Sequence, residues 1–402
     1  MFARTEYMQQ LKMFRDQNII KVVTGVRRCG KSTLFELYRE YLISTGVSDS
    51  QIIFINLEDL EFEALLDYKE LYKYVKDLLV SNKMNYVFID EVQNCISFEK
   101  VVDSLFIRDN VDLYITGSNA YMLSGELATL LSGRYITIEM LPLSFYEYCL
   151  ATSNSSKPVN EKFNDYMNLG SFPYGALLDQ SSTMVRPYLE GIYNTILIKD
   201  VATREGITDV TLLESIVKTM ASGIGSPISI KKISDTIQSG GRKISVNTVD
   251  TYVRTLTDSY IFYKVDRFDI KGRQYLKTLG KYYIVDTGVR QMLLSQESPD
   301  LGHLIENIVY LELKRRGYRV NIGKLEQKEI DFVVSSPDGI EYYQVSASVL
   351  DEKTLKRELE PLASIADHHP KYLLTLDVIG KGVSHNGIRQ INLVDWLIDG
   401  RL

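Results

Sequence analysis

The chain has 402 residues, of which 45% are hydrophobic and 24% are charged, so it can bury ordinary cores and lacks the composition of a disordered protein. Its 46 Lys and Arg against 52 Asp and Glu give a net charge of −6, which excludes an overall basic, histone-like nucleic-acid binder. A chain of this length predicts about two to four folded domains.

Cysteine usage and the N-terminus indicate where the protein works. Three widely spaced cysteines, Cys29, Cys95 and Cys149, fit neither a disulfide framework nor a zinc-binding CxxC motif, which favours a reducing compartment. The charged N-terminus lacks the apolar core of a signal peptide, and no apolar run reaches the roughly 18 residues of a membrane span. We therefore expect a cytoplasmic protein that is not inserted into a membrane.

The first 150 residues alternate short β-branched runs with longer helical patterns. The runs expected to form strands are residues 19–24, 52–56, 86–90, 111–116 and 134–138. Continuous apolar strands separated by helices indicate an α/β domain with a parallel sheet. A segment rich in Ser, Asn and Thr follows, so we place the first domain at residues 1–152.

A phosphate-loop motif follows the first expected strand as Gly25-Val26-Arg27-Arg28-Cys29-Gly30-Lys31-Ser32-Thr33. Its backbone N–H groups and the next helix N-terminus would bind phosphate. We expect Lys31 to reach the β- and γ-phosphates of ATP and the Ser32 hydroxyl to ligate Mg²⁺. Cys29 is expected to be a spacer, because the loop needs only its backbone at that position.

Two carboxylates end the third expected strand, at the edge where open α/β sheets bind ligands. This pattern is typical of a Walker B element, in which Asp90 would hold Mg²⁺ through water and Glu91 would orient or deprotonate the attacking water. The fourth strand ends in Thr116-Gly117-Ser118-Asn119. Ser118 or Asn119 is the candidate sensor of the γ-phosphate, and a plain turn is the alternative.

Arg134 precedes the fifth expected strand. It is a candidate arginine finger acting on a neighbouring subunit of a homo-oligomer, because Arg delivers a fixed charge to the transition state. A surface salt bridge is the alternative interpretation.

The second half of the chain predicts three further parts. Residues 160–225 show a helical pattern, residues 226–298 show two short helices followed by a strand hairpin, typical of a winged helix, and residues 300–402 form a second α/β pattern. Residues 231–290 contain 12 Lys or Arg and 6 Asp or Glu. This basic region would fit DNA phosphates, and a protein-binding or merely solvated face is the alternative.

These motifs, together with Leu141-Pro142-Leu143-Ser144-Phe145-Tyr146-Glu147 and Ser132-Gly133-Arg134, resemble AAA-superfamily ATPases of the AAA_14 type that carry a C-terminal domain of unknown function 4143. The resemblance implies a C-terminal PD-(D/E)xK nuclease-like fold, with Glu306, Glu329-Ile330-Asp331 and Gln344-Val345-Ser346 at the positions of the nuclease motifs. Ser346 stands where the resemblance implies a lysine. Because that lysine stabilises charge on the reacting phosphate, we expect a binding or docking domain whose cleavage activity is weak or absent.

The sequence therefore predicts a Mg²⁺-dependent ATPase that binds ATP and ADP and couples its nucleotide cycle to C-terminal domains that bind DNA or a partner. Alternatives are a binding switch that hydrolyses ATP slowly and, less favoured, an ATP-regulated nuclease.

Overall fold

The computed structural model describes residues 4–120, 131, 133–179, 181–202, 206–294 and 300–398, except for the side chains at 199, 277 and 278. The chain divides into two compact units, residues 1–142 with 258–260 and residues 143–257 with 261–402. The three C-terminal parts expected from the sequence fall in the second unit, apart from 258–260, and that finer division stays a prediction. Within the described residues, every helix is too short or too polar to cross a lipid bilayer.

The first unit is built on a parallel sheet with strand order β2-β3-β4-β1-β5. Its strands are β1 (Ile20–Thr24), β2 (Ile52–Asn56), β3 (Asn85–Asp90), β4 (Val111–Gly117) and β5 (Tyr135–Glu139). Each boundary lies within one residue of the expected one, which confirms the predicted α/β fold of this part.

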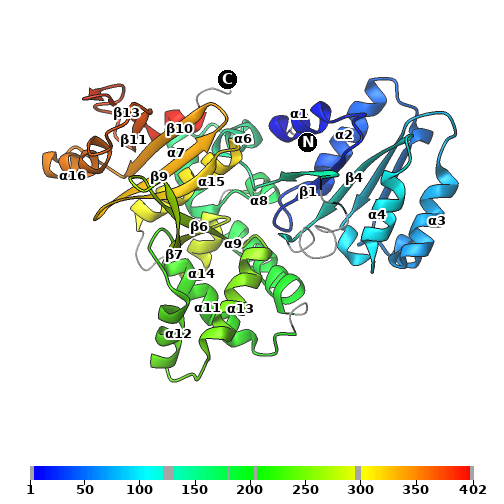
Figure 1. Ribbon diagram of the computed structural model, residues 1–402, viewed down its shortest axis with the longest axis horizontal. Coiled ribbons are helices and arrows are strands. Elements are labelled where there is room, and N and C mark those ends of the chain that lie inside the picture. The colour runs from blue at the N-terminus through cyan, green and yellow to red at the C-terminus, as the bar shows by residue number, and fades with distance from the viewer. Residues whose placement is uncertain are drawn as a thin grey trace. The chain divides into compact units, whose positions relative to one another are not determined.

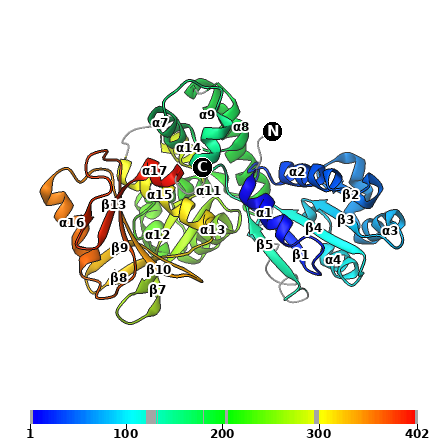
Figure 2. The same ribbon diagram turned by 90° about the horizontal axis from the view of Figure 1, so that it is seen from above.

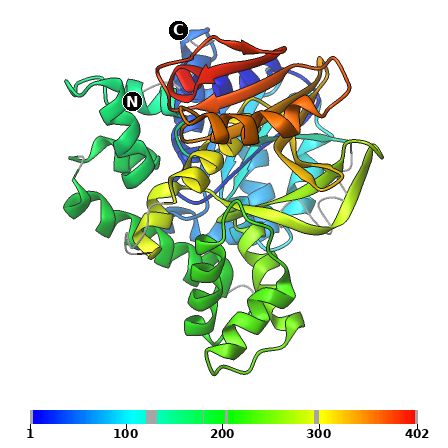
Figure 3. The same ribbon diagram turned by 90° about the vertical axis from the view of Figure 1, so that its left-hand side faces the viewer.

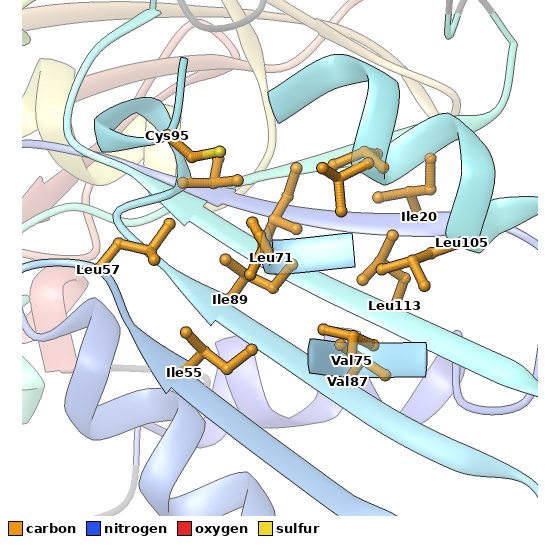
Figure 4. Packing of buried hydrophobic residues seen from close by; sticks show 14 of the residues in the cluster. Ile20, Ile55, Leu57, Leu71, Val75, Val87, Ile89, Cys95, Leu105 and Leu113 are labelled. Carbon is orange, nitrogen blue, oxygen red and sulfur yellow. The ribbon is translucent and has the colours of Figure 1, made fainter. Parts of the chain in front are cut away.

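Helices cover both faces of this sheet, as Figures 1 and 2 show. Neighbouring strand residues point to opposite faces. Val87 belongs to the apolar cluster under α3 (Tyr68–Leu78) and α4 (Phe98–Phe106), drawn in Figure 4. Phe88 instead lies in an aromatic cluster with residues of α2 (Lys31–Ser44). Both faces being buried explains why the strands have continuous apolar sequences. The other elements of this unit are α1 (Thr5–Met13), η1 (Asp49–Gln51), η2 (Leu60–Leu66) and η3 (Val92–Asn94).

The second unit begins with helices. They are α6 (Phe145–Ala151), α7 (Val159–Leu169), α8 (Pro173–Leu177), α9 (Ser182–Thr195), η5 (Ile196–Ala202), α11 (Val210–Ser222), α12 (Ile230–Ser239) and α13 (Val246–Asp258). Ser144 begins α6 with a capping box, its hydroxyl accepting the Glu147 N–H at 3.0 Å while the Glu147 carboxylate accepts the Ser144 N–H at 2.8 Å.

A mixed sheet of eight strands follows, in the order β12-β13-β11-β10-β9-β8-β6-β7. Its strands are β6 (Phe262–Asp269), β7 (Gln274–Ile284), β8 (Arg319–Leu325), β9 (Lys328–Ser336), β10 (Gly339–Ser346), β11 (Lys371–Thr375), β12 (Ser384–His385) and β13 (Ile388–Asn392). The β6–β7 hairpin, expected to be the wing of a winged helix, joins this sheet because β6 pairs in parallel with β8. Figure 3 shows the hairpin in yellow-green at the edge of the sheet.

Two helices pack on opposite faces of the central strands. Tyr310 of α15 (Leu301–Arg315) lies against Phe332, with ring centroids 6.4 Å apart. Leu362 of α16 (Glu352–Ala363) packs in the cluster that contains Val333, the next residue of the strand. The remaining helices of this unit are α14 (Thr287–Leu294) and α17 (Leu393–Ile398).

Candidate functional site

The phosphate-loop residues lie at the carboxyl end of β1, directly before α2. Gly25 has a φ of +144°, and a Cβ added there would lie 2.1 Å from the Met140 carbonyl oxygen. Gly30 has a φ of +105° and accepts the Leu34 N–H at 2.9 Å as α2 begins. Both positions therefore require glycine, which is why the motif fixes these two residues.

Lys31 points back into the loop. Its Nζ donates to the Gly25 carbonyl at 3.0 Å and lies 3.5 Å from Oε1 of Glu91. Burial alone would lower the pKa of Lys31, but the nearby negative charges, to which Glu91 contributes most and Asp90 adds, together outweigh burial and raise the pKa. The ammonium is therefore charged and buried next to the loop carbonyls, where an anionic phosphate would be bound.

Asp90 has one satisfied and one unsatisfied oxygen. Thr116 donates its hydroxyl to Oδ1, and the Ser32 hydroxyl also hydrogen-bonds this carboxyl. Burial raises the pKa of Asp90, and these two hydrogen bonds offset part of that effect. Oδ2 is buried and has no hydrogen-bond partner among the described residues. A buried, unpaired carboxylate oxygen beside a serine hydroxyl is a donor set that fits Mg²⁺.

Glu91 lies in the left-handed region with a φ of +54°, and its N–H donates to the Thr116 hydroxyl at 2.8 Å. Its Oε2 accepts the Gln93 amide at 2.5 Å, and Ser118 also hydrogen-bonds the carboxylate. Burial would raise the pKa of Glu91, but the charge of Lys31 and the Gln93 hydrogen bond lower it. The carboxylate is thus held ionised, as a base must be.

The other predicted loop and sensor residues lie around this centre. Val26 and Cys29 are fully buried, Thr33 is half-buried, and burial raises the pKa of the Cys29 thiol, which keeps it protonated. Arg27 pairs with Glu58 at 2.5 Å. Arg28 adopts a φ of +68° and Asn119 is buried at the end of β4.

Arg4 is a site residue that sequence reasoning missed. Its buried guanidinium donates to the Cys29 carbonyl at 3.0 Å and to the Leu141 carbonyl at 2.7 Å. It therefore ties the phosphate loop to the segment after β5. A lone arginine before the first helix carries no local signal for this contact, which links residues far apart in the chain.

Arg134 does not lie beside the phosphate loop of its own chain. The Arg134 carbonyl accepts the Ile20 N–H at 2.8 Å, which places it where β1 begins, whereas the loop follows the end of β1. Its guanidinium pairs with Asp103 at 2.5 Å and is 45% exposed. Ser132 of the same motif lies outside the described residues. If Arg134 contacts a nucleotide, that nucleotide would have to be bound to another subunit.

A second cluster of charges lies within the other unit. Lys281 of β7 is buried, with Nζ 3.0 Å from Glu306 and 2.9 Å from Glu329. Tyr283 donates to the same Glu306 oxygen at 2.6 Å, and Oδ2 of Asp331 accepts the Val345 N–H at 2.9 Å. Lys281 thus joins Glu306 to Glu329, and the charges of Glu306 and Lys281 also act on Asp331, so the expected acids lie near one another.

Lys281 supplies a cation to Glu306 and Glu329, whereas the resemblance implies a lysine at position 346. Ser346 itself donates to the Ser348 carbonyl at 3.2 Å, and Gln344 donates to Glu358 at 3.0 Å. Lys281 was missed because it comes from a strand about 60 residues earlier in the chain.

The expected DNA-binding residues are partly neutralised. Ion pairs join Arg242 to Asp209 at 3.7 Å and Arg254 to Asp250 at 3.0 Å. Lys271 pairs with Glu326 at 3.0 Å. Exposed basic residues in this region also include Lys231, Lys232, Lys243 and Arg273. The Lys277 side chain lies outside those described.

A parallel sheet whose first strand leads into a phosphate loop, with Asp90 and Glu91 at the next strand edge, defines a P-loop domain of the AAA type. Residues 17–149 match the family model of an AAA domain, AAA_14. Residues 160–300 match a domain of unknown function, DUF8612. The sequence resemblance implies domain of unknown function 4143, which is not the domain matched here, and its presence stays a prediction.

The proteins similar to this chain include two relatives and one solved structure. An uncharacterized protein of Haemophilus influenzae is 38% identical over 404 residues, which cover 99% of each chain. Uncharacterized protein MJ1544 of Methanocaldococcus jannaschii is 30% identical over 362 residues, 85% of this chain and 78% of that protein. The chain belongs to the family of these two proteins.

The solved structure is the Walker-type ATPase PABY2304 of Pyrococcus abyssi, which is 16% identical with a TM-score of 0.52 over 73% of this chain and 96% of that chain. At this identity the likeness shows a shared fold. Together with the AAA domain and the phosphate-loop geometry, it supports ATP binding by this chain.

Proposed function

We propose that this protein hydrolyses ATP to ADP and phosphate in a Mg²⁺-dependent reaction. The observation that carries the proposal is the position of Glu91, an ionised carboxylate 3.5 Å from the phosphate-loop Lys31. A base beside the expected γ-phosphate is the arrangement that hydrolysis needs, whereas ATP binding alone needs only the loop.

Each residue of the site has a role in this proposal. The N–H groups of the loop and Lys31 bind the β- and γ-phosphates, and Ser118 or Asn119 senses the γ-phosphate. Ser32 and Asp90 would hold Mg²⁺, which when bound neutralises charge on the phosphate oxygens. Glu91 orients the attacking water and accepts its proton.

A slow binding switch is the second candidate. The favouring observation is that Glu91 shares its carboxylate with Lys31, Gln93 and Ser118, so these partners compete with the attacking water for Glu91. Phosphate release measured with saturating ATP, with and without DNA, separates the candidates. A turnover on the order of 1 per second or faster supports the enzyme, and stoichiometric ATP retention with turnover below about 1 per hour supports the switch.

We further propose that the basic region around α12 and the β6–β7 hairpin contacts DNA. Exposed Lys231, Lys232 and Lys243 supply charge that can neutralise phosphates. The test is binding of a DNA duplex at several salt concentrations by wild-type protein and by Lys231→Ala/Lys232→Ala. If these lysines contact phosphate, the variant's log–log salt slope should fall by about 2. An unchanged slope rejects their assignment.

The C-terminal domain is proposed to be nuclease-like but inactive. Lys281 already neutralises Glu306 and Glu329, so a divalent cation would have to compete with its ammonium for these acids. The test is incubation of linear, supercoiled and single-stranded DNA with protein and Mg²⁺ or Mn²⁺. Cleavage that is lost in Asp331→Ala and persists in Lys31→Ala would show an active nuclease.

A further inference from the structure

The side chain of Gln93 connects the candidate base to the end of the fourth strand. Gln93 lies in η3, two residues after Glu91, and its Nε2 donates to Oε2 of Glu91 at 2.5 Å and to the Ser118 hydroxyl at 3.3 Å. The two hydrogens of the amide nitrogen are therefore both used within the site.

This orientation of the amide follows from its partner. An ionised carboxylate accepts hydrogen bonds and cannot donate them, so the nitrogen of Gln93 must face Glu91. The amide oxygen then points elsewhere. Oε1 of Gln93 is buried and has no hydrogen-bond partner among the described residues. A buried amide oxygen without a donor is costly, so a donor bound there would stabilise the site.

A water molecule next to Glu91 would supply that donor. Water has two hydrogens, and a nucleophilic water must have both directed so that a lone pair faces phosphorus. Glu91 can accept one hydrogen and Oε1 of Gln93 can accept the other. Because Gln93 also donates to Glu91, the amide fixes both acceptors relative to each other.

We propose that Gln93 is a catalytic residue that orients the attacking water, an inference that rests on the proposed hydrolysis of ATP. The water oxygen forms a bond to the γ-phosphorus as the bond from that phosphorus to the β–γ bridging oxygen breaks. ADP leaves with that electron pair, and one proton of the water passes to Glu91. Gln93 keeps its own protons throughout and contributes only geometry and hydrogen bonds.

The test compares Gln93→Ala and Gln93→Glu with wild-type protein, with Asn94→Ala as the matched control. Asn94 is the next residue, is exposed, and its side chain donates to the Leu57 carbonyl at 3.3 Å. Affinity is measured with a fluorescent ATP analogue, and hydrolysis is measured in a single turnover at saturating ATP over a range of pH.

Gln93→Ala should bind ATP within about threefold of wild type and hydrolyse it about 10- to 100-fold more slowly, because the water loses one acceptor. Gln93→Glu keeps an oxygen acceptor but loses the N–H groups that bind Glu91 and Ser118, so it should also hydrolyse ATP more slowly than wild type while still binding it. Asn94→Ala should stay within about twofold of wild type in both measurements.

The outcomes separate this inference from the proposed function. Absence of hydrolysis by wild-type protein would overturn both. Hydrolysis by wild type that Gln93→Ala matches would overturn the role of Gln93 alone. A Gln93→Ala variant that loses ATP affinity as much as rate would also overturn it, because the residue would then act in binding or folding.

Discussion

The Lys31 ammonium lies 3.5 Å from the Glu91 carboxylate, and each keeps the other charged in a buried site. The phosphate-binding cation and the candidate base are therefore electrostatically linked. A phosphate that draws Lys31 toward itself would weaken its hold on Glu91, so nucleotide binding and release of the base are expected to occur together.

Replacement of Lys31 should show this link. Lys31→Ala should lower ATP affinity about 10- to 100-fold, because a charge-assisted hydrogen bond to phosphate is lost. Titration with a fluorescent ATP analogue measures this, with Lys73→Ala on the exposed face of α3 as control. Equal affinities of the two variants would exclude Lys31 from phosphate binding.

The glycine at the start of the loop should be intolerant of a methyl group. Gly25→Ala places Cβ against the Met140 carbonyl, whereas Gly46→Ala has a comparable positive φ of +95° with nothing within 4 Å. We expect Gly46→Ala to cost about 1 kcal/mol of unfolding free energy and Gly25→Ala about 3 kcal/mol, with loss of ATP binding. Denaturant unfolding of both variants checks this, and equal costs would mean that the contact with Met140 is relieved without penalty.

Apolar strand runs that alternate with helical patterns predicted the first sheet. The phosphate loop and Asp90-Glu91 were predictable because each motif consists of consecutive residues, and because parallel strands end at the same edge of a sheet. Contacts between distant segments were not predictable. Arg4 reaches Leu141, Lys281 reaches Glu306, and β6 pairs with β8. No spacing rule within a single segment reports such pairs, because each depends on how separately formed elements pack.

Arg134 is expected to act between subunits. Since it lies at the end of the strands opposite the phosphate loop, mixing Arg134→Ala with Lys31→Ala should restore some ATPase activity through one intact composite site. The Arg134–Asp103 pair is exposed, so Arg134→Ala should fold normally. Subunit mixing followed by phosphate release measures this. A fully active monomer on sizing would contradict a role in trans.

The Asp331 environment predicts a pH-dependent stability. Burial and the charges of Glu306 and Glu358 raise the pKa of Asp331 to about 8, although Lys281 opposes the shift. The unfolded carboxyl has a pKa of about 3.9, so the folded state binds the extra proton between these values. The stabilising contribution of the protonated group is complete below about pH 4 and is lost as pH rises through about 8.

Asp331→Asn cannot ionise and should therefore gain thermal stability over wild type as pH rises from about 4 to 8, with a constant difference above that range. Melting temperatures at pH 5, 7 and 9 test this, with exposed Asp338→Asn as control. A difference that is the same at all three values would show that Asp331 does not bind the proton.

Glu91→Gln tests the central claim most directly, because it removes the base and keeps the size of the side chain. The measurement is ATP affinity and single-turnover phosphate release for wild type and this variant with Mg²⁺. Wild type should release phosphate, and Glu91→Gln should bind ATP within about threefold of wild type while hydrolysing it at least about 100-fold more slowly. Equal rates of phosphate release for the two proteins would contradict the assignment of Glu91 as the base of an ATPase.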